Sequence, residues 1–138
     1  GRMKGGLGRR MILRIPDDAY APLPPVNLGI QSGRHQYAPE GLFGGGKGAK
    51  AAFLVNGQPG NPYGLSQLKP GDLVTIDAAG GGGYGDPLER ELAMVETDVR
   101  EGYVSLQAAE KDYGVIIDSS TGVADAAATE KRREAMTQ

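Results

Sequence analysis

The 138-residue sequence contains no cysteine and no tryptophan, only two phenylalanines and a single histidine. The lack of cysteine excludes disulfides, thiolate zinc sites and a cysteine nucleophile, and it favours a cytoplasmic location. No apolar run approaches the roughly 20 residues of a membrane-spanning helix, and we expect no signal peptide. Because only 39% of the residues are apolar, the chain can bury only a modest core by itself. We therefore expect it to complete its core against a partner.

The net charge of the chain indicates which kinds of partner it can bind. The sequence has 15 Lys and Arg against 17 Asp and Glu, a formal net charge of −2. Nucleic-acid-binding domains usually carry a strongly basic surface. This balance therefore argues against nucleic acid as the main partner, and the missing apolar run argues against a membrane.

Glycine and proline are abundant, with 23 and 9 residues. Between the turns that they form lie short apolar segments that are typical of β-strands, and in residues 26–31 apolar and polar residues alternate as in a half-buried strand. The predicted strands are 10–15, 26–31, 51–56, 73–77 and a short fifth one at 115–118. Residues 17–25 are expected to form a loop with polyproline character. Glycine lets such polyproline-like segments pack side by side, since it has no side chain to keep backbones apart.

Two short helices are predicted near the C-terminus. Asp86 has the side chain of an N-cap, and Pro87 suits the first helical position. The apolar residues that follow recur at helical spacing and form one stripe: Leu88, Leu92, Val95 and Val99. Gly102 is placed to end this helix, and Ser105 and Gly114 are placed to begin and end a shorter one. The whole pattern predicts a β-rich α+β fold, with Gly/Pro-rich strands and polyproline-like segments followed by two short helices.

The four consecutive glycines at 80–83 raise the question of nucleotide binding. Gly80, Gly82 and Gly85 have the spacing of a dinucleotide-binding fingerprint and lie between a strand and a helix. The chain lacks the second parallel strand that such a unit needs, and Asp86 would place a carboxylate beside the pyrophosphate. We therefore expect these glycines to be structural, adopting positive φ and letting another backbone approach closely.

Residues 41–48 resemble a phosphate-binding P-loop, but the position after Lys47 is Gly48 where the loop needs Ser or Thr to hold magnesium. We expect neither a cofactor nor a metal in this chain. His35 is the only histidine and cannot build a metal site alone. Together with Arg34 and Lys47, it is a weak candidate for a contribution to a site shared with another chain.

Four segments together resemble the C-terminal part of hydantoinase B-type subunits. They are "GRMKGGLG" (1–8), "GRHQYAPEGLFGGGKGA" (33–49), "LKPGDLVTIDAAGGGGYGDPLER" (68–90) and "DVREGYVSLQAAEKDYGVII" (98–117). This family includes N-methylhydantoinase B, the matching half of 5-oxoprolinases, and subunits of acetone and acetophenone carboxylases. Where members often have "PPWGLFGG", this chain has Ala38 and Glu40 in place of Pro and Trp, so one aromatic contact differs.

The resemblance implies a multisubunit complex that uses ATP to activate a cyclic amide or an enolate for hydrolysis or carboxylation. It places ATP and Mg²⁺ on a hydantoinase A-type subunit. A metal-dependent site is expected in the larger N-terminal portion of the B-type subunit, which this chain does not match. The implied partners are the A-type subunit and the remainder of the B-type subunit. The chain itself is then a small subunit or C-terminal segment, with a non-catalytic scaffold as the alternative.

The resemblance also suggests how the chain is organised. Residues 1–118 form the hydantoinase B-like module, while the small, polar and then charged composition of residues 119–138 predicts a polar tail, either helical or frayed. The family's glycine-rich region is associated with bundled polyproline-like segments, which suits 33–64 and 79–86. We expect the docking surface of the module to include the following residues: Gly80, Gly81, Gly82, Gly83, Tyr84, Gly85 and Asp86.

Overall fold

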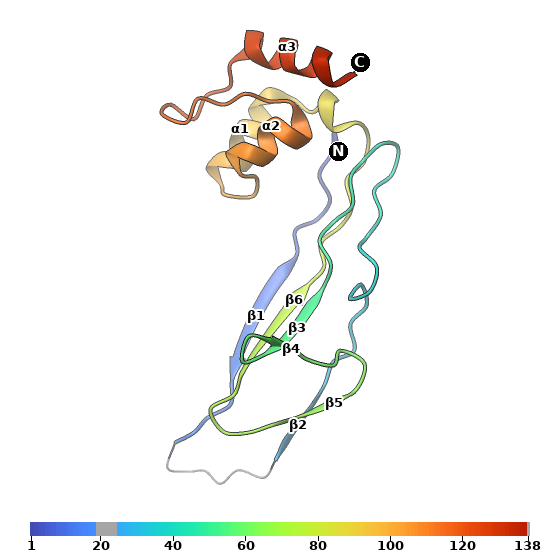
Figure 1. Cartoon of the computed structure of the whole chain (residues 1–138), viewed down its shortest axis with the longest axis vertical. Helices are drawn as coiled ribbons and strands as arrows, with labels where there is room; N and C mark the ends of the chain where they lie inside the picture. The colour runs from blue at the N-terminus through green and yellow to red at the C-terminus, as the bar shows by residue number, and fades with distance from the viewer. Residues whose placement is uncertain (19–24, 138) are drawn as a thin grey trace. The chain divides into compact units, whose positions relative to one another are not determined.

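A computed structural model describes residues 1–18 and 25–137, which fall into two compact units. Unit 1 comprises residues 1–5, 40–46 and those from Gly82 onward, and unit 2 comprises residues 6–39 and 47–81. Every strand of the described chain lies in unit 2 and every helix in unit 1 (Figure 1). The predicted α+β class is therefore confirmed, whereas the proline-rich loop at 17–25 lies largely outside the described residues.

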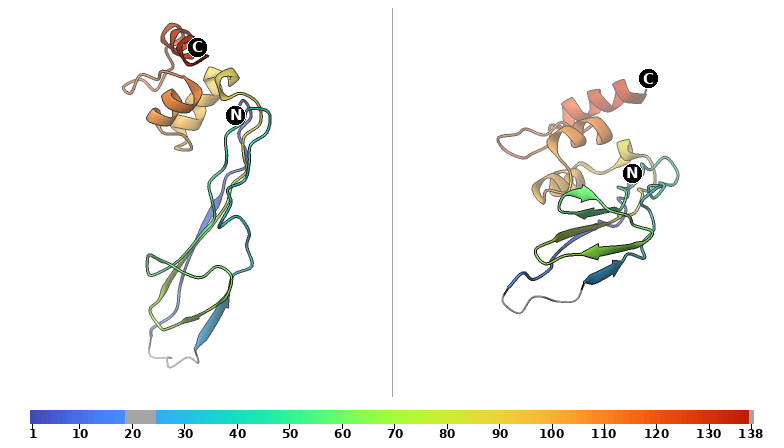
Figure 2. Two further views of the ribbon diagram at one scale, coloured as in Figure 1. Left: turned by 45° about the vertical axis from the view of Figure 1, so that its right-hand side comes forward. Right: turned by 60° about the horizontal axis from the view of Figure 1, so that its bottom comes forward.

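Unit 2 consists of two antiparallel sheets. The larger has the strand order β1-β6-β3-β4, and the smaller pairs β2 with β5 (Figure 2). The strands are β1 (Arg9–Arg14), β2 (Val26–Gly29), β3 (Ala52–Val55), β4 (Gln58–Pro59), β5 (Leu65–Leu68) and β6 (Leu73–Ala78). Phe53, Leu68 and Val74 form the buried core of this unit, one from each of β3, β5 and β6.

Four of the predicted strands are confirmed, as β1, β2, β3 and β6. The sequence analysis missed β4 because residues 57–64 are dominated by turn formers, and it missed β5, the four residues that follow them. Asn56 and Gly57 both have positive φ, 50° and 77°, and Asn-Gly is the pair that favours a two-residue hairpin. This turn reverses β3 into β4. The fifth strand predicted at 115–118 is wrong, since that segment makes only an isolated bridge between Ile117 and Ala124.

Unit 1 is built around a small helical core. Its elements are the 3₁₀ helix η1 (Pro87–Glu89) and the helices α1 (Leu92–Arg100), α2 (Leu106–Tyr113) and α3 (Ala126–Thr137). Val95, Ala109 and Val115 are buried together, with Leu92 and Val99 packed against them. The apolar stripe predicted from the spacing therefore faces this core. No helix in residues 1–18 and 25–137 is both long enough and apolar enough to cross a bilayer.

The caps of these helices follow the sequence closely, with one correction. Ser105 Oγ accepts a hydrogen bond from Ala108 N at 3.1 Å, and Gly114 ends α2 with a left-handed φ of 63°. Asp86 caps only η1, by accepting from Leu88 N at 2.8 Å. The single helix predicted from Asp86 is interrupted because Arg90 is extended (φ −67°, ψ 134°), and α1 begins after it.

The last 20 residues, for which the sequence left a helical and a frayed tail open, contain the helix α3. Its sequence is polar on all sides, so periodicity does not mark it. Thr129 nevertheless is buried, and its Oγ1 accepts a hydrogen bond from Ile116 N at 3.0 Å. Arg133 donates to Tyr113 O at 3.0 Å. Tertiary contacts of polar side chains therefore attach α3 to unit 1, while the division into 1–118 and 119–138 stays a prediction.

Candidate functional site

Three irregular segments of unit 1 pair through their backbones, and we call them the glycine bundle: residues 1–3, 41–46 and 82–85. Tyr84 lies in the middle and exchanges two hydrogen bonds with Met3, both 2.9 Å. On its other side, Leu42 N donates to Gly83 O and Gly85 N donates to Leu42 O, again at 2.9 Å. A further bond runs from Gly83 N to Gly46 O at 2.9 Å. The bundle thus joins segments far apart in sequence without a regular sheet.

Close backbone approach explains why the bundle is made of glycine. A Cβ added at Gly82 would overlap the backbone of Glu40 and lie 2.7 Å from Gly41 N. One added at Gly83 would lie 2.7 Å from Gly1 N. Real side chains essentially never make such contacts, so these positions have no room for one. The neighbours are other parts of the same chain, although the sequence also allowed a partner chain.

The remaining glycines of this run differ in their surroundings. Gly80 and Gly81 belong to unit 2, where Gly81 N donates to Gly6 O at 2.8 Å and a Cβ on Gly80 would lie 2.7 Å from the same oxygen. The expected positive φ is wrong for all four consecutive glycines; of this run only Gly85 has it, at 73°. At Gly80, Gly82 and Gly83 the requirement for glycine is therefore one of space.

A buried ion network fastens the N-terminal segment to α1. Asp98 and Arg90 are only 3% and 5% exposed. Arg90 donates to Asp98 Oδ2 at 2.8 Å and to Arg2 O at 2.8 Å, and the Lys4 ammonium pairs with Asp98 Oδ1 and lies 4.5 Å from the centre of the Tyr103 ring. The two cations share the Asp98 carboxylate, so the buried Arg90 guanidinium has a charged partner, as burial requires, while its Nε has no hydrogen-bond partner. The sequence reading missed this network, although a carboxylate three residues after Val95 on the apolar face of a helix was a usable signal.

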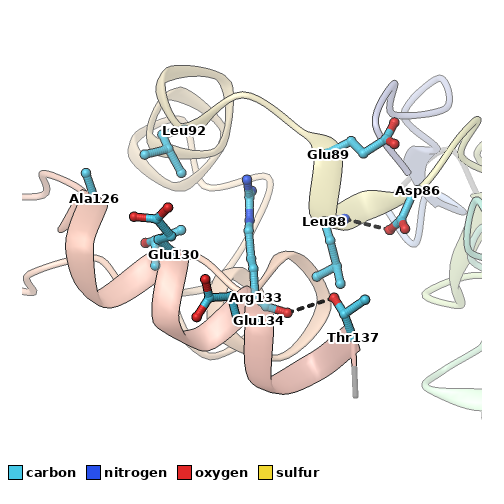
Figure 3. A pocket seen from close by; sticks show the side chains of 10 residues that line it. Asp86, Leu88, Glu89, Leu92, Ala126, Glu130, Arg133, Glu134 and Thr137 are labelled. Carbon is cyan, nitrogen blue, oxygen red and sulfur yellow. Dashed lines mark hydrogen bonds between the residues drawn. The ribbon is translucent and has the colours of Figure 1, made fainter.

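An open groove of about 860 Å³ lies between η1 and α3 (Figure 3). Leu88 and Leu92 supply its apolar lining, and carboxylates surround them: Asp86, Glu89, Glu130 and Glu134. Arg133 also lines the groove, and burial lowers the pKa of its guanidinium. This side chain donates to Tyr113 O and, at 2.7 Å, to Arg90 O. Its donors therefore serve the fold, which leaves an acidic groove with an apolar floor.

The predicted polar contributors to a shared site all belong to unit 2. His35 is half-buried, its Nε2 lies 2.7 Å from Ser32 Oγ, and its ring is edge-on to Tyr63 at 6.1 Å. Arg34 adopts a left-handed φ of 70°, and its carbonyl accepts from Ala51 N at 3.0 Å. Lys47 is exposed in an irregular segment. Ser32 was not singled out in the sequence; its hydroxyl is positioned to orient the imidazole.

Across residues 1–18 and 25–137, no three side chains among His, Asp and Glu come together in a way that could hold a metal ion. The residues described therefore supply no metal ligand set around His35.

The sequence is similar to a known protein family and to several known proteins. The model of the family described as hydantoinase B/oxoprolinase matches residues 1–87. The beta subunit of caprolactamase from Pseudomonas jessenii is 51% identical over 71 residues, which are 51% of this chain and 12% of that protein. An uncharacterized protein of Methanocaldococcus jannaschii is 34% identical over 122 residues, which are 85% of this chain and 20% of that protein. The chain thus spans only about an eighth to a fifth of these relatives.

One solved structure shares the fold over nearly the whole chain. The crystal structure of the ATP-dependent caprolactamase from Pseudomonas jessenii superposes with a TM-score of 0.68 and 34% identity. The superposition covers 97% of this chain and 24% of that one. Both units described above therefore have counterparts inside a much larger polypeptide.

Proposed function

Because the chain belongs to the hydantoinase B/oxoprolinase family, we propose that it completes the B-type subunit of an ATP-dependent complex that hydrolyses a cyclic amide or carboxylates a ketone. In this role it is a small subunit or C-terminal segment that docks the partner subunits, as in an acetophenone carboxylase-like assembly. The observation that carries the proposal is the superposition of nearly the whole chain on about a quarter of an ATP-dependent caprolactamase chain.

In this proposal the chain has a structural role in assembly, and its partners carry out the ATP-dependent chemistry. The glycine bundle and the Arg90–Asp98 network hold unit 1 in one shape for docking. ATP with Mg²⁺ binds the hydantoinase A-type subunit, and a divalent metal, where one is used, binds the remainder of the B-type subunit. The isolated chain is then inactive, and the assembled complex works in the cytoplasm.

Reconstitution tests this assignment. The chain is co-expressed with a hydantoinase A-type subunit and with a B-type polypeptide that lacks the matched segment, and native mass spectrometry identifies which chains assemble. ATP-dependent turnover of hydantoins, 5-oxoproline, lactams and ketones is then measured for the complex and for the chain alone. We expect turnover only with the complex. Turnover of any of these substrates by the chain alone would contradict the proposal.

A contribution of unit 2 to a shared active site forms a second part of the proposal. His35, oriented by Ser32, supplies a proton-transfer group, while Lys47 and Arg34 supply positive charge for a phosphate or carboxylate. His35→Ala and Lys47→Ala are expected to lower kcat at least tenfold with the assembly intact by native mass spectrometry. If both variants turn over substrate at the wild-type rate, the chain is the non-catalytic scaffold that the sequence left open as the alternative.

A further inference from the structure

One face of the glycine bundle carries four large apolar side chains, which we call the Phe43 patch: Met3, Leu42, Phe43 and Tyr84. They are 51%, 61%, 78% and 46% exposed. Tyr84 is bridged to Met3 on one side and to Leu42 on the other, and directly paired residues present their side chains to the same face. The Phe43 ring lies 5.2 Å from the Tyr84 ring, centre to centre. Contiguous exposed apolar groups of this kind mark interaction surfaces.

The backbone at Phe43 is strained in a way that local structure does not explain. Phe43 and Gly44 have φ of 50° and 87°, and Gly45 N closes the turn onto Leu42 O at 3.0 Å. Positive φ at both central positions is the pattern of a type I′ turn, which favours Asn-Gly. A phenyl ring has no hydrogen-bonding group to stabilise this conformation, and left-handed backbone is unfavourable for a bulky residue.

The chain contains a matched turn that uses the favoured residue. Asn56 and Gly57 have nearly the same φ values, 50° and 77°. The Asn56 side chain accepts from Leu73 N at 2.9 Å and donates to Asp72 at 2.8 Å. The same backbone shape is therefore made once with a stabilising side chain and once with an exposed aromatic ring. Strain that is retained at an exposed aromatic residue points to a function of that residue.

We infer that the Phe43 patch is the surface by which this module packs on the remaining part of a hydantoinase B-type subunit, in an apolar pocket centred on the Phe43 ring. The inference rests on the proposed function. Each relative continues well beyond the matched segment, since the chain covers only 12% to 24% of them. The rest of such a B-type subunit is therefore several times larger than this module, and each module has one such partner. All four side chains of the patch are uncharged, so the complementary surface is apolar rather than ionic.

Photo-crosslinking tests the identity of the occupant. Benzoylphenylalanine replaces Phe43 in the co-expressed complex, and Val123, which is 57% exposed on a loop of the same unit, is replaced in the control. We expect crosslinks from position 43 to B-type peptides outside the matched segment and none of them from position 123. Crosslinks to a second copy of this chain, crosslinks only to the A-type subunit, or crosslinks no stronger than the control would overturn the inference.

Phe43→Asn separates binding from folding, because it removes the ring and installs the residue that the turn favours. The measurements are the affinity of the full chain for the B-type subunit and its urea unfolding midpoint. We expect the dissociation constant to rise at least about 30-fold, or about 2 kcal/mol at 1.4 kcal/mol per tenfold change. The unfolding midpoint should stay at or above the wild-type value, and Val123→Asn should change affinity less than about twofold.

Two results distinguish what has failed. If Phe43→Asn keeps the wild-type unfolding midpoint and binds like the wild type, the patch is not the docking surface. If the wild-type chain does not associate with B-type or A-type subunits at all, the proposed function itself is wrong, and this inference fails with it.

Discussion

Gly82→Ala adds one methyl group at a crowded position of the glycine bundle. Because the new Cβ would overlap the backbone of Glu40, the segments 40–42 and 82–85 must separate. Separation weakens three hydrogen bonds, from Leu42 N to Gly83 O, from Gly85 N to Leu42 O and from Gly83 N to Gly46 O. Each of these hydrogen bonds contributes about 1 kcal/mol to stability. The alanine also makes the unfolded chain less flexible, which restores about 0.4–1 kcal/mol. The free energy of unfolding should therefore fall by about 2–2.5 kcal/mol.

Gly46→Ala is the matched control. Gly46 belongs to the same bundle, its φ is not positive, and a Cβ placed on it meets nothing within 4 Å. The assay is urea unfolding of the full chain followed by circular dichroism, with hydrogen exchange of the Leu42, Gly83 and Gly85 amides. Gly82→Ala should also lower the thermal midpoint by about 8–10 °C, while Gly46→Ala should match or exceed the wild type. Equal unfolding midpoints for the two variants would refute the steric reasoning.

Three further variants probe other parts of the fold. Asp98→Asn leaves the buried Arg90 guanidinium without its carboxylate, and we expect the free energy of unfolding to fall by about 3–5 kcal/mol in urea titrations. A backbone hydrogen bond from Lys69 N is the main cause that holds the pKa of Asp72 below its usual 3.8. The resulting stability is present above pH 3.8 and is lost as the pH falls through the lower folded pKa. Between pH 6 and pH 2.5, the urea midpoint of Asp72→Asn should therefore drop less than that of the wild type. Gly114→Ala forces a side chain into a left-handed φ of 63° and should lower the free energy of unfolding by about 1–2 kcal/mol; an unchanged midpoint would contradict this role of the cap.

Much of the fold could be predicted from the sequence, because strand patterns and helix caps involve residues that are close together in the chain. Short apolar or alternating segments between turn residues predicted β1, β2, β3 and β6, and the caps Ser105 and Gly114 predicted both ends of α2. These signals depend on side chains reaching their own backbone or on the two faces of one strand. The family resemblance was also legible, because several glycine-rich motifs recur in one order, and it is confirmed by the family match over residues 1–87.

The sequence by itself also determined what this chain cannot do, since without cysteine it has neither thiolate chemistry nor disulfides. It predicted a structural role for the glycines at 80–83, but it did not reveal which backbones they face, and the positive φ that it predicted for them is wrong. Only the tertiary structure decided that Tyr84 lies between Met3 and Leu42. It also decided that Arg90 interrupts the predicted helix and that α3 packs through polar side chains. The physical reason is distance along the chain: these contacts join residues tens of positions apart, and no local pattern encodes which segments meet.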